Sequence, residues 1–307
     1  MTVAVYSETL KYTHNLRTNH SKRHASVSGI LHYLGVSTSG YYAWKKHTPS
    51  KTENHRNEMK GRIQEIYQQS HQIYGAPKIT AVLQQSGHSI SQRTTGKYMR
   101  QMGLHALWVR HWTRTTVNSD FDLKLQNILN EQFNPSAPNT VWVSDITYIW
   151  TDEGFVYLTS VMDLFSRKIL AWVLSRTLEA KYVVETVQKA VSERRGAKPR
   201  VFHNDRGKQY VSREFLKETQ GMINSYSKKG YPWDNACIES FHSLIKREWL
   251  NRFKIENYDQ AYRYVFEYIN TFYNTVRIHS HCDYQSPNQY ETAYLKRLSK
   301  MDRDQAG

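Results

Sequence analysis

The apolar residues between positions 140 and 250 change period several times, and this constrains the fold most. Within 140–150 they alternate, which places Val143 and Asp145 on one face of a strand and Trp142 on the other. Further apolar runs predict strands at 155–163, 167–175, 199–205 and 222–227 and helices at 179–194 and 236–250. A helical connection precedes the strand at 222–227. This succession predicts a layered α/β domain.

Charge restricts the partners of the chain. Its 42 Lys and Arg residues outnumber its 27 Asp and Glu residues and give a net charge of +15. This surplus exceeds what solubility requires and suits a polyanion, of which nucleic acid is the usual one. Aromatic residues make up 13% of the chain, which supports a packed core and excludes a disordered basic tail.

Cysteine usage and hydropathy indicate the compartment. The two cysteines, Cys237 and Cys282, imply no disulfide framework, and no set of four Cys or His residues has the spacing of a zinc site. The N-terminus lacks the apolar core of a signal peptide, and no run of about 18 apolar residues occurs. We therefore expect a soluble cytoplasmic protein with no membrane partner.

Two helix-turn-helix patterns occupy the first hundred residues. In 25–46 Gly35 suits a bend and Ser37 suits the N-cap of a second helix. In 74–104 an apolar helical face precedes a turn, and Ser91 suits the N-cap of the following helix. The pair predicts a small all-α DNA-binding region.

The helix after Ser91 carries a basic stripe. Arg93, Lys97 and Arg100 lie at i, i+4 and i+7, so they share one face that can reach phosphates and base edges in a major groove. The alternative is an ordinary solvated face. Two tandem helix-turn-helix patterns in a strongly basic chain favour DNA binding.

A loosely patterned basic segment follows, with a short helix predicted around Leu123–Gln132 and a Pro/Asn/Ser cluster at 134–139 that marks a domain boundary. We predict a DNA-binding region at 1–105, a basic linker at 106–135, a catalytic core with a helical extension at 136–295, and a polar tail at 296–307.

Three acids fall at matching levels of the predicted layers. Asp145 lies in the first strand, Asp205 ends the fourth, and Glu239 lies on the last helix. If the first and fourth strands are neighbours, these carboxylates converge and supply the oxygen ligands that two Mg²⁺ ions require. From the residues alone, Asp205 could instead open a turn. A fourth acid, Asp163, stands at the start of a predicted β-turn and is interpreted as structural.

Several ordered motifs resemble one family. They are "GVSTSGYYAW", "YGAPKITAVL", "VWVSDITYIW", "VMDLFSRKILAW", "HNDRGKQY", "GYPWDNACIESFHSLIKRE" and "FYNTVRIHSHCDYQSPNQYE". Together, over about 23–295, they resemble the OrfB-type DDE transposases of insertion-sequence family three, which are similar to retroviral integrases. The resemblance implies a ribonuclease-H-like integrase core with a five-stranded mixed sheet. It maps the family's three acids onto Asp145, Asp205 and Glu239.

The chain departs from the family pattern in three places. Glu239 follows Asp205 by 34 positions, where the family usually has one or two more, and we expect the connection at 215–224 to absorb the difference. His242 replaces a common aromatic residue and Asn204 a common Ser. None of these changes removes a ligand.

Other residues near the acids receive structural or DNA-binding interpretations. Lys246 lies two helical turns after Glu239, and with the adjacent Arg247 it could hold a DNA phosphate, since the family has a basic residue there. Asn235 is expected to cap the helix, and Arg277 is expected to pack against the core.

The resemblance implies binding of the element's terminal inverted repeats, cleavage, and strand transfer into target DNA. It also implies two Mg²⁺ ions (Mn²⁺ can substitute), a circular intermediate, a homo-oligomer on DNA, and a possible OrfA-type partner from an upstream frame. Alternatives are a non-catalytic DNA-binding regulator, a decayed transposase, or a ribonuclease-H-like nuclease without strand transfer.

Overall fold

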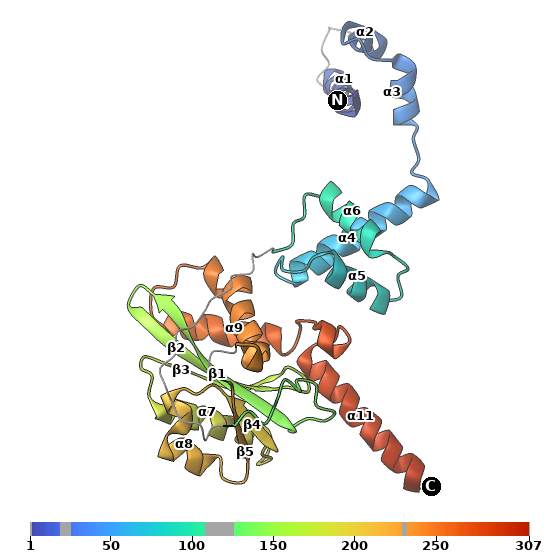
Figure 1. The fold of residues 1–307 in the computed structure, drawn as a ribbon. Helices are drawn as coiled ribbons and strands as arrows, with labels where there is room; N and C mark the ends of the chain where they lie inside the picture. The colour runs from blue at the N-terminus through green and yellow to red at the C-terminus, as the bar shows by residue number, and fades with distance from the viewer. Residues whose placement is uncertain (1, 19–25, 108–125, 229–231, 307) are drawn as a thin grey trace. The chain divides into compact units, whose positions relative to one another are not determined.

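The alternating segments form one five-stranded sheet in the computed structural model (Figure 1). Its strands are β1 (Val141–Thr151), β2 (Gly154–Asp163), β3 (Ile169–Ser175), β4 (Val201–Asn204) and β5 (Ile223–Tyr226). The order is β3-β2-β1-β4-β5; β1, β2 and β3 are antiparallel, whereas β4 is parallel to β1 and to β5. The predicted mixed sheet is confirmed.

Helices cover both faces of the sheet, as the alternation in β1 requires. Trp142 packs in a core with residues of α7 (Ala180–Glu193) and α8 (Arg213–Glu218), while Val143 packs in a second core with α9 (Ala236–Glu248). Figure 1 shows α7 and α8 on one side of the sheet and α9 on the other. The predicted α/β class with an integrase-like core is confirmed.

The C-terminal part of the chain is helical. After α9 come the short 3₁₀ segment η3 (Leu250–Arg252), α10 (Tyr258–Phe266), the π-helical η4 (Glu267–Tyr273), the 3₁₀ segment η5 (Ser280–Cys282) and α11 (Pro287–Ala306). Two further 3₁₀ segments, η1 (Lys208–Val211) and η2 (Pro232–Asn235), flank α8 and β5. The predicted polar tail is thus helical up to residue 306.

The structure describes residues 2–18, 26–107, 126–228 and 232–306, which belong to two compact units, Met1–Arg62 and Ile63–Gly307. The N-terminal helices are α1 (Thr2–Thr18), α2 (Val27–Tyr33), α3 (Thr38–Lys45), α4 (Lys51–Gln69), α5 (Ala76–Gln85) and α6 (Gln92–Gln101). None of the helices in these ranges is both long enough and apolar enough to cross a membrane.

Both predicted helix-turn-helix patterns are present as helix pairs. The predicted serine caps are confirmed: the Ser37 hydroxyl accepts from the Gly40 amide at the start of α3, and the Ser91 hydroxyl accepts from the Thr94 amide at the start of α6. The smaller unit packs around Tyr6, Leu31 and Tyr41.

The larger unit contains α5 and α6 as well as the sheet. Tyr74, just before α5, ties the helical part to the C-terminal segment, because its hydroxyl accepts from the Ile278 amide at 2.9 Å. The compact units therefore divide at position 62, within α4, and the functional boundary near 105 stays a prediction. Most of the predicted linker, 108–125, lies outside the described residues.

Side chains and a short irregular segment cover the two edge strands. At β3 the Asn274 side chain accepts from the Ile169 amide and donates to the Ile169 carbonyl. At β5 the Tyr226 amide donates to the Gln126 carbonyl, and the Ser225 hydroxyl accepts from the amides of residues 128 and 129. The helix predicted around Leu123–Gln132 is wrong in its described part, because residues 126–128 have no regular secondary structure, residues 129–131 form a bend and a turn, and no helix follows through 132.

Candidate active site

The parallel pairing of β1 with β4 places two of the three acids side by side. Ser144 is the register partner of Asn204, so Asp145 and Asp205, the next residue on each chain segment, emerge at the same level of the sheet. Strand β4 ends at Asn204, whereas β1 continues to Thr151. The two chain segments stop pairing at this point, where ligand sites of α/β sheets commonly lie.

Glu239 joins these two acids from the first turn of α9. Burial, followed by the charge of Asp145, raises the pKa of the Asp205 carboxyl to about 6. Burial, followed by the charges of Asp145 and Asp205, raises the pKa of the Glu239 carboxyl to about 7. The structure therefore brings the three predicted acids within electrostatic reach of one another, and the gathered negative charge favours a bound cation.

The Asp205 carboxylate is held by the turn that follows it. Its Oδ1 accepts from the Gly207 amide at 2.9 Å. A Cβ atom at position 207 would lie 2.9 Å from the same oxygen, closer than real Cβ contacts. The glycine thus permits the close approach of backbone and carboxylate.

Polar neighbours surround the Asp145 end of the site. The His242 Nδ1 atom lies 3.4 Å from Asp145 Oδ2, and the buried Tyr210 hydroxyl lies 2.9 Å from the Ser144 hydroxyl. Asn235 occupies the N-cap position of α9, but the predicted side-chain cap is wrong: its amide donates to the Ser144 carbonyl at 3.5 Å instead. The contacts of His242 and Asn235 link β1 to α9, and the contact of Tyr210 links β1 to η1.

Asp163 is structural, as its sequence context predicts. It is fully buried, and its carboxylate accepts from the backbone amides of Asn139 and Phe165 and from Arg194. Arg277 is also buried, and it pairs with Glu248 at the end of α9.

The predicted DNA-contacting residues lie in two places. Arg93, Lys97 and Arg100 are all exposed on α6. On α9, Lys246 and Arg247 are half-buried, and the Lys246 Nζ atom lies 4.3 Å from the centre of the Tyr148 ring. This cation–π contact joins residues almost a hundred positions apart, so no local sequence pattern predicts it.

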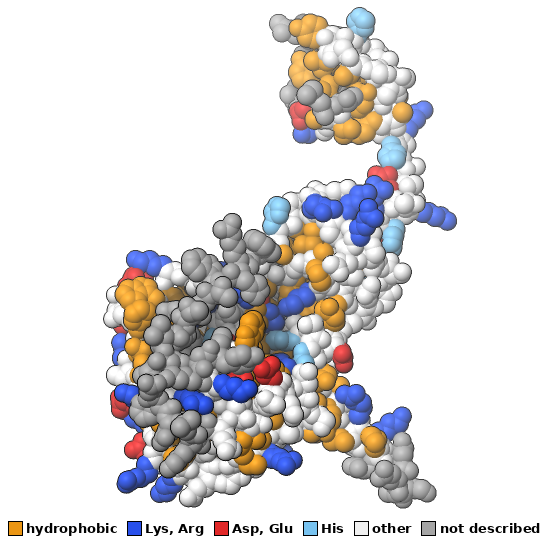
Figure 2. Space-filling view, in the orientation of Figure 1, with side chains coloured by type: hydrophobic (Ala, Val, Ile, Leu, Met, Phe, Trp, Pro, Cys, Tyr) orange, Lys and Arg blue, Asp and Glu red, His pale blue; other side chains and the backbone are white. Residues whose placement is uncertain are grey.

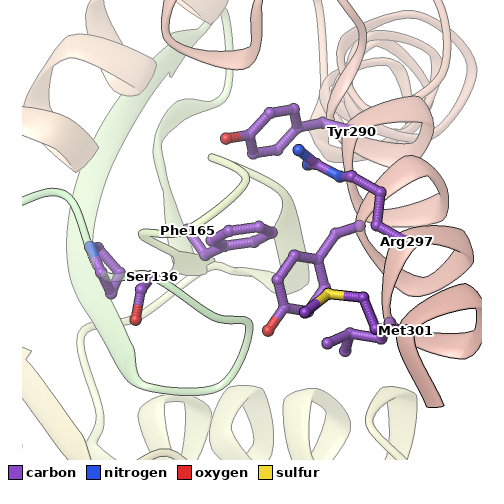
Figure 3. Close-up of a pocket in the computed structure, with 8 residues that line it drawn as sticks. Ser136, Phe165, Tyr290, Arg297 and Met301 are labelled. Atoms are coloured by element: carbon purple, nitrogen blue, oxygen red, sulfur yellow. The ribbon is translucent and has the colours of Figure 1, made fainter. Parts of the chain in front are cut away.

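In the described ranges, no group of three or more His, Cys, Asp or Glu side chains is arranged so that it could hold a metal ion as it stands. A cavity of about 370 Å³ lies elsewhere, against α11. Figure 3 shows Tyr290, Arg297 and Met301 of α11 facing Phe165 across it. Its lining contains no acid, so we place the candidate site at the carboxylates.

Comparison with known families agrees with this geometry. Residues 135–232 and 220–287 each match a family described as an integrase core domain, and residues 54–112 match a family described as an HTH-like domain. The first match contains β1 and β4, and the second contains α9.

Curated relatives cover most of the chain. It is 36% identical to the transposase for insertion sequence element IS904 of Lactococcus lactis, over 79% of this chain and 97% of the relative. It is also 32% identical to the transposase InsF of insertion sequence IS3A from Escherichia coli, over 88% of this chain and 95% of InsF. The chain belongs to the IS3 family of transposases.

The transposase also resembles a solved structure of the HTLV-2 integrase catalytic core domain in complex with magnesium. The match has a TM-score of 0.39 and 17% identity, and it covers 51% of this chain and 98% of the other.

Family membership confirms the predicted class of enzyme. The transposase is a DDE-type, DNA-cleaving and strand-transferring enzyme with an integrase core and an HTH-like domain. The assignment of individual residues and ions to this reaction stays a prediction.

Proposed function

We propose that Asp145, Asp205 and Glu239 are the catalytic residues of this transposase and hold two Mg²⁺ ions, for which Mn²⁺ can substitute. The observation that carries the proposal is the convergence of three carboxylates, two of which have pKa values raised by burial and by the negative charge of the others. Such a cluster is stable at neutral pH when a cation neutralises it.

The donor set fits these ions chemically. Mg²⁺ prefers carboxylate oxygens and keeps several waters, so three open carboxylates suit it better than a closed cage of protein ligands. When bound, paired divalent ions activate an attacking oxygen and stabilise a leaving oxygen in phosphoryl displacement.

Other residues of the chain position the three carboxylates. The Gly207 amide holds one oxygen of Asp205, and β1 and β4 fix the separation of the two aspartates. Helix α9 brings Glu239 within electrostatic reach of them and adds His242 beside Asp145. In this proposal water first cleaves at an element end, and the freed 3′-hydroxyl then attacks a second phosphodiester, with no covalent protein–DNA intermediate.

DNA reaches the site through two surfaces in this proposal. The exposed stripe of α6, Arg93, Lys97 and Arg100, binds the terminal inverted repeats, and Lys246 with Arg247 holds phosphates near the carboxylates. Joining two ends requires more than one chain, so we propose a homo-oligomer on DNA, with an OrfA-type protein as a further partner.

Oligonucleotides that carry the inverted repeats flanking the reading frame test this proposal. With Mg²⁺ the wild-type protein should yield both cleaved and joined products, and Asp205→Asn should yield neither. Asp259→Asn, which removes an exposed acid on α10, is the matched control and should act as wild type. Wild-type strand transfer by Asp205→Asn would overturn the acid assignment, and cleavage without joining by the wild type would favour a nuclease.

A further inference from the structure

An exposed aromatic surface lies at the tip of the β1–β2 hairpin, apart from the carboxylates. Tyr148, Trp150 and Phe155 are 43%, 62% and 49% exposed. Phe155 meets the other two rings edge-on, with centroids 5.3 Å from Tyr148 and 4.8 Å from Trp150. In Figure 2 hydrophobic side chains gather at the left margin of the larger unit, over this hairpin tip.

The core does not account for these rings. Ile149 and Val156, the neighbours that point to the opposite face, are 4% and 3% exposed, so the hairpin already buries one face. Trp150 is the register partner of Phe155, which puts both rings on the solvent face. A cluster of exposed large aromatic residues indicates a binding surface.

Charge around the rings suits a polyanion. Lys246, which lies on the same helix as Glu239, holds its ammonium 4.3 Å from the Tyr148 ring. The two acids at the hairpin tip are neutralised locally, since Lys254 pairs with Asp152 and Arg176 pairs with Glu153. Aromatic rings beside a cation are the usual composition of sites that stack unpaired bases.

We propose that Tyr148, Trp150 and Phe155 form a stacking platform for unpaired nucleobases of DNA, with Lys246 beside it for a phosphate. The binding itself is independent of catalysis, and its place in the reaction rests on the proposed function of the carboxylates.

The position of the platform defines which nucleotides it takes. Tyr148 and Trp150 follow Asp145 by three and five residues, or about 10 and 17 Å along the strand at about 3.3 Å per residue. Because Tyr148 and Trp150 face away from Asp145, this span is a minimum, and at about 3.4 Å per stacked base it corresponds to at least roughly three to five nucleotides from the phosphate at the carboxylates. Strand β4 ends opposite Ser144, so it leaves this part of the β1 edge unpaired. The platform thus holds bases that separate from the duplex near the reacting end.

Binding to single-stranded DNA without divalent metal tests the platform. Oligothymidylate of about 20 nucleotides and a duplex of equal length are titrated into the full-length protein. Trp150→Ala should weaken oligothymidylate binding about tenfold, because one base–aromatic stack contributes about 1–3 kcal/mol. Duplex binding should change less than about twofold, since a paired duplex keeps its bases stacked on each other.

Matched variants separate stacking from folding. Trp150→Phe keeps an aromatic face and should retain most of the affinity. Phe266→Ala removes another exposed ring, 45% exposed at the end of α10, and should bind oligothymidylate as wild type does. Photo-crosslinking with oligothymidylate that contains 5-iodouracil should label Tyr148, Trp150 or Phe155.

Three results would overturn the platform: unchanged oligothymidylate binding by Trp150→Ala, an equal loss for duplex and single strand, or crosslinks confined to other residues. A change in oligomeric state on sedimentation, with single-strand affinity intact, would assign the rings to a second copy of the chain instead. Because these measurements exclude metal, failure of the catalytic assignment would leave their outcome unaffected.

Discussion

At the residue scale, the geometry of the candidate site depends on one missing side chain. The Gly207 amide donates to the Asp205 carboxylate, and the space that a Cβ atom would need is taken by that carboxylate. A larger residue at position 207 must therefore displace the very group that we propose as a ligand.

We predict that Gly207→Ala lowers the rate of cleavage about 100-fold, the loss that displacement of a reacting group by about 1 Å produces. It should also raise the Mg²⁺ concentration needed for half-maximal rate, while binding of the end sequence stays normal. Cleavage rates measured across a Mg²⁺ series check both effects. Gly61→Ala is the control, because nothing lies within 4 Å of its added Cβ. A Gly207→Ala protein with the wild-type Mg²⁺ requirement would contradict the positioning role.

At the element scale, α9 is fixed at both ends. Glu239 lies in its first turn and Glu248 at its last residue. The Glu248 carboxylate accepts from Arg277 at 2.6 and 2.7 Å and from the Tyr268 hydroxyl at 2.7 Å. Burial raises the pKa of Glu248, but the hydrogen bonds and charge of Arg277 outweigh this and leave the pKa below its ordinary value.

We predict that Glu248→Gln destabilises the protein by about 3–5 kcal/mol at neutral pH, because it leaves Arg277 buried and unpaired. A carboxyl whose folded-state pKa is lowered contributes stability above its ordinary pKa of 4.5 and loses it as the pH falls through the folded value. The difference in free energy of unfolding between variant and wild type should therefore shrink as the pH falls below 4.5. Denaturant titrations at several pH values measure it. Glu185→Gln breaks an exposed pair with Lys189 and should cost less than about 1 kcal/mol.

The basic stripe of α6 should affect binding rather than chemistry. We predict that Arg93→Ala weakens binding of the terminal repeat and lowers the salt slope by roughly one unit, with residual cleavage still dependent on Mg²⁺. Glu239→Gln should bind the repeat normally, or more tightly, and cleave nothing. Gel-shift and cleavage assays on one oligonucleotide compare the two variants. An equal loss of binding in both would show that either the DNA-binding surface or the active site is assigned to the wrong residues.

At the scale of the whole molecule, alternation and helical period predicted the layers because they are local signals. The choice of Asp145, Asp205 and Glu239 among the acids came from the resemblance to a transposase family, and their catalytic role stays a prediction. The period of the strand placed Asp145 on the same face as Val143, and the packing of Val143 with α9 shows which helix covers that face. The helix prediction is wrong at 126–129, because the backbone amides of Ile128 and Leu129 donate to the Ser225 hydroxyl, almost a hundred positions away. The contacts of His242 and Lys246 likewise required tertiary packing that no local pattern contains.

Stability should reveal the carboxylate cluster even without DNA. Raised pKa values of about 6 and 7 mean that Asp205 and Glu239 stabilise the fold in their protonated forms, and this contribution is lost as the pH rises through those values. We predict that Asp205→Asn raises the Tm of the metal-free protein by about 2–4 °C near pH 8, and that the gain fades toward about pH 4. Mg²⁺ should raise the Tm of the wild type more than that of the variant. Thermal unfolding with and without Mg²⁺ decides this.

The covered sheet edges have a practical consequence for dissecting the protein. An uncovered edge strand is a template for aggregation. Residues 126–129 protect β5, yet they precede position 136, where the sequence places the start of the catalytic core. A fragment that begins at 136 should therefore scatter more light than one that begins at 126 at equal concentration. The few residues before the first strand then determine how readily fragments of the core aggregate through β5.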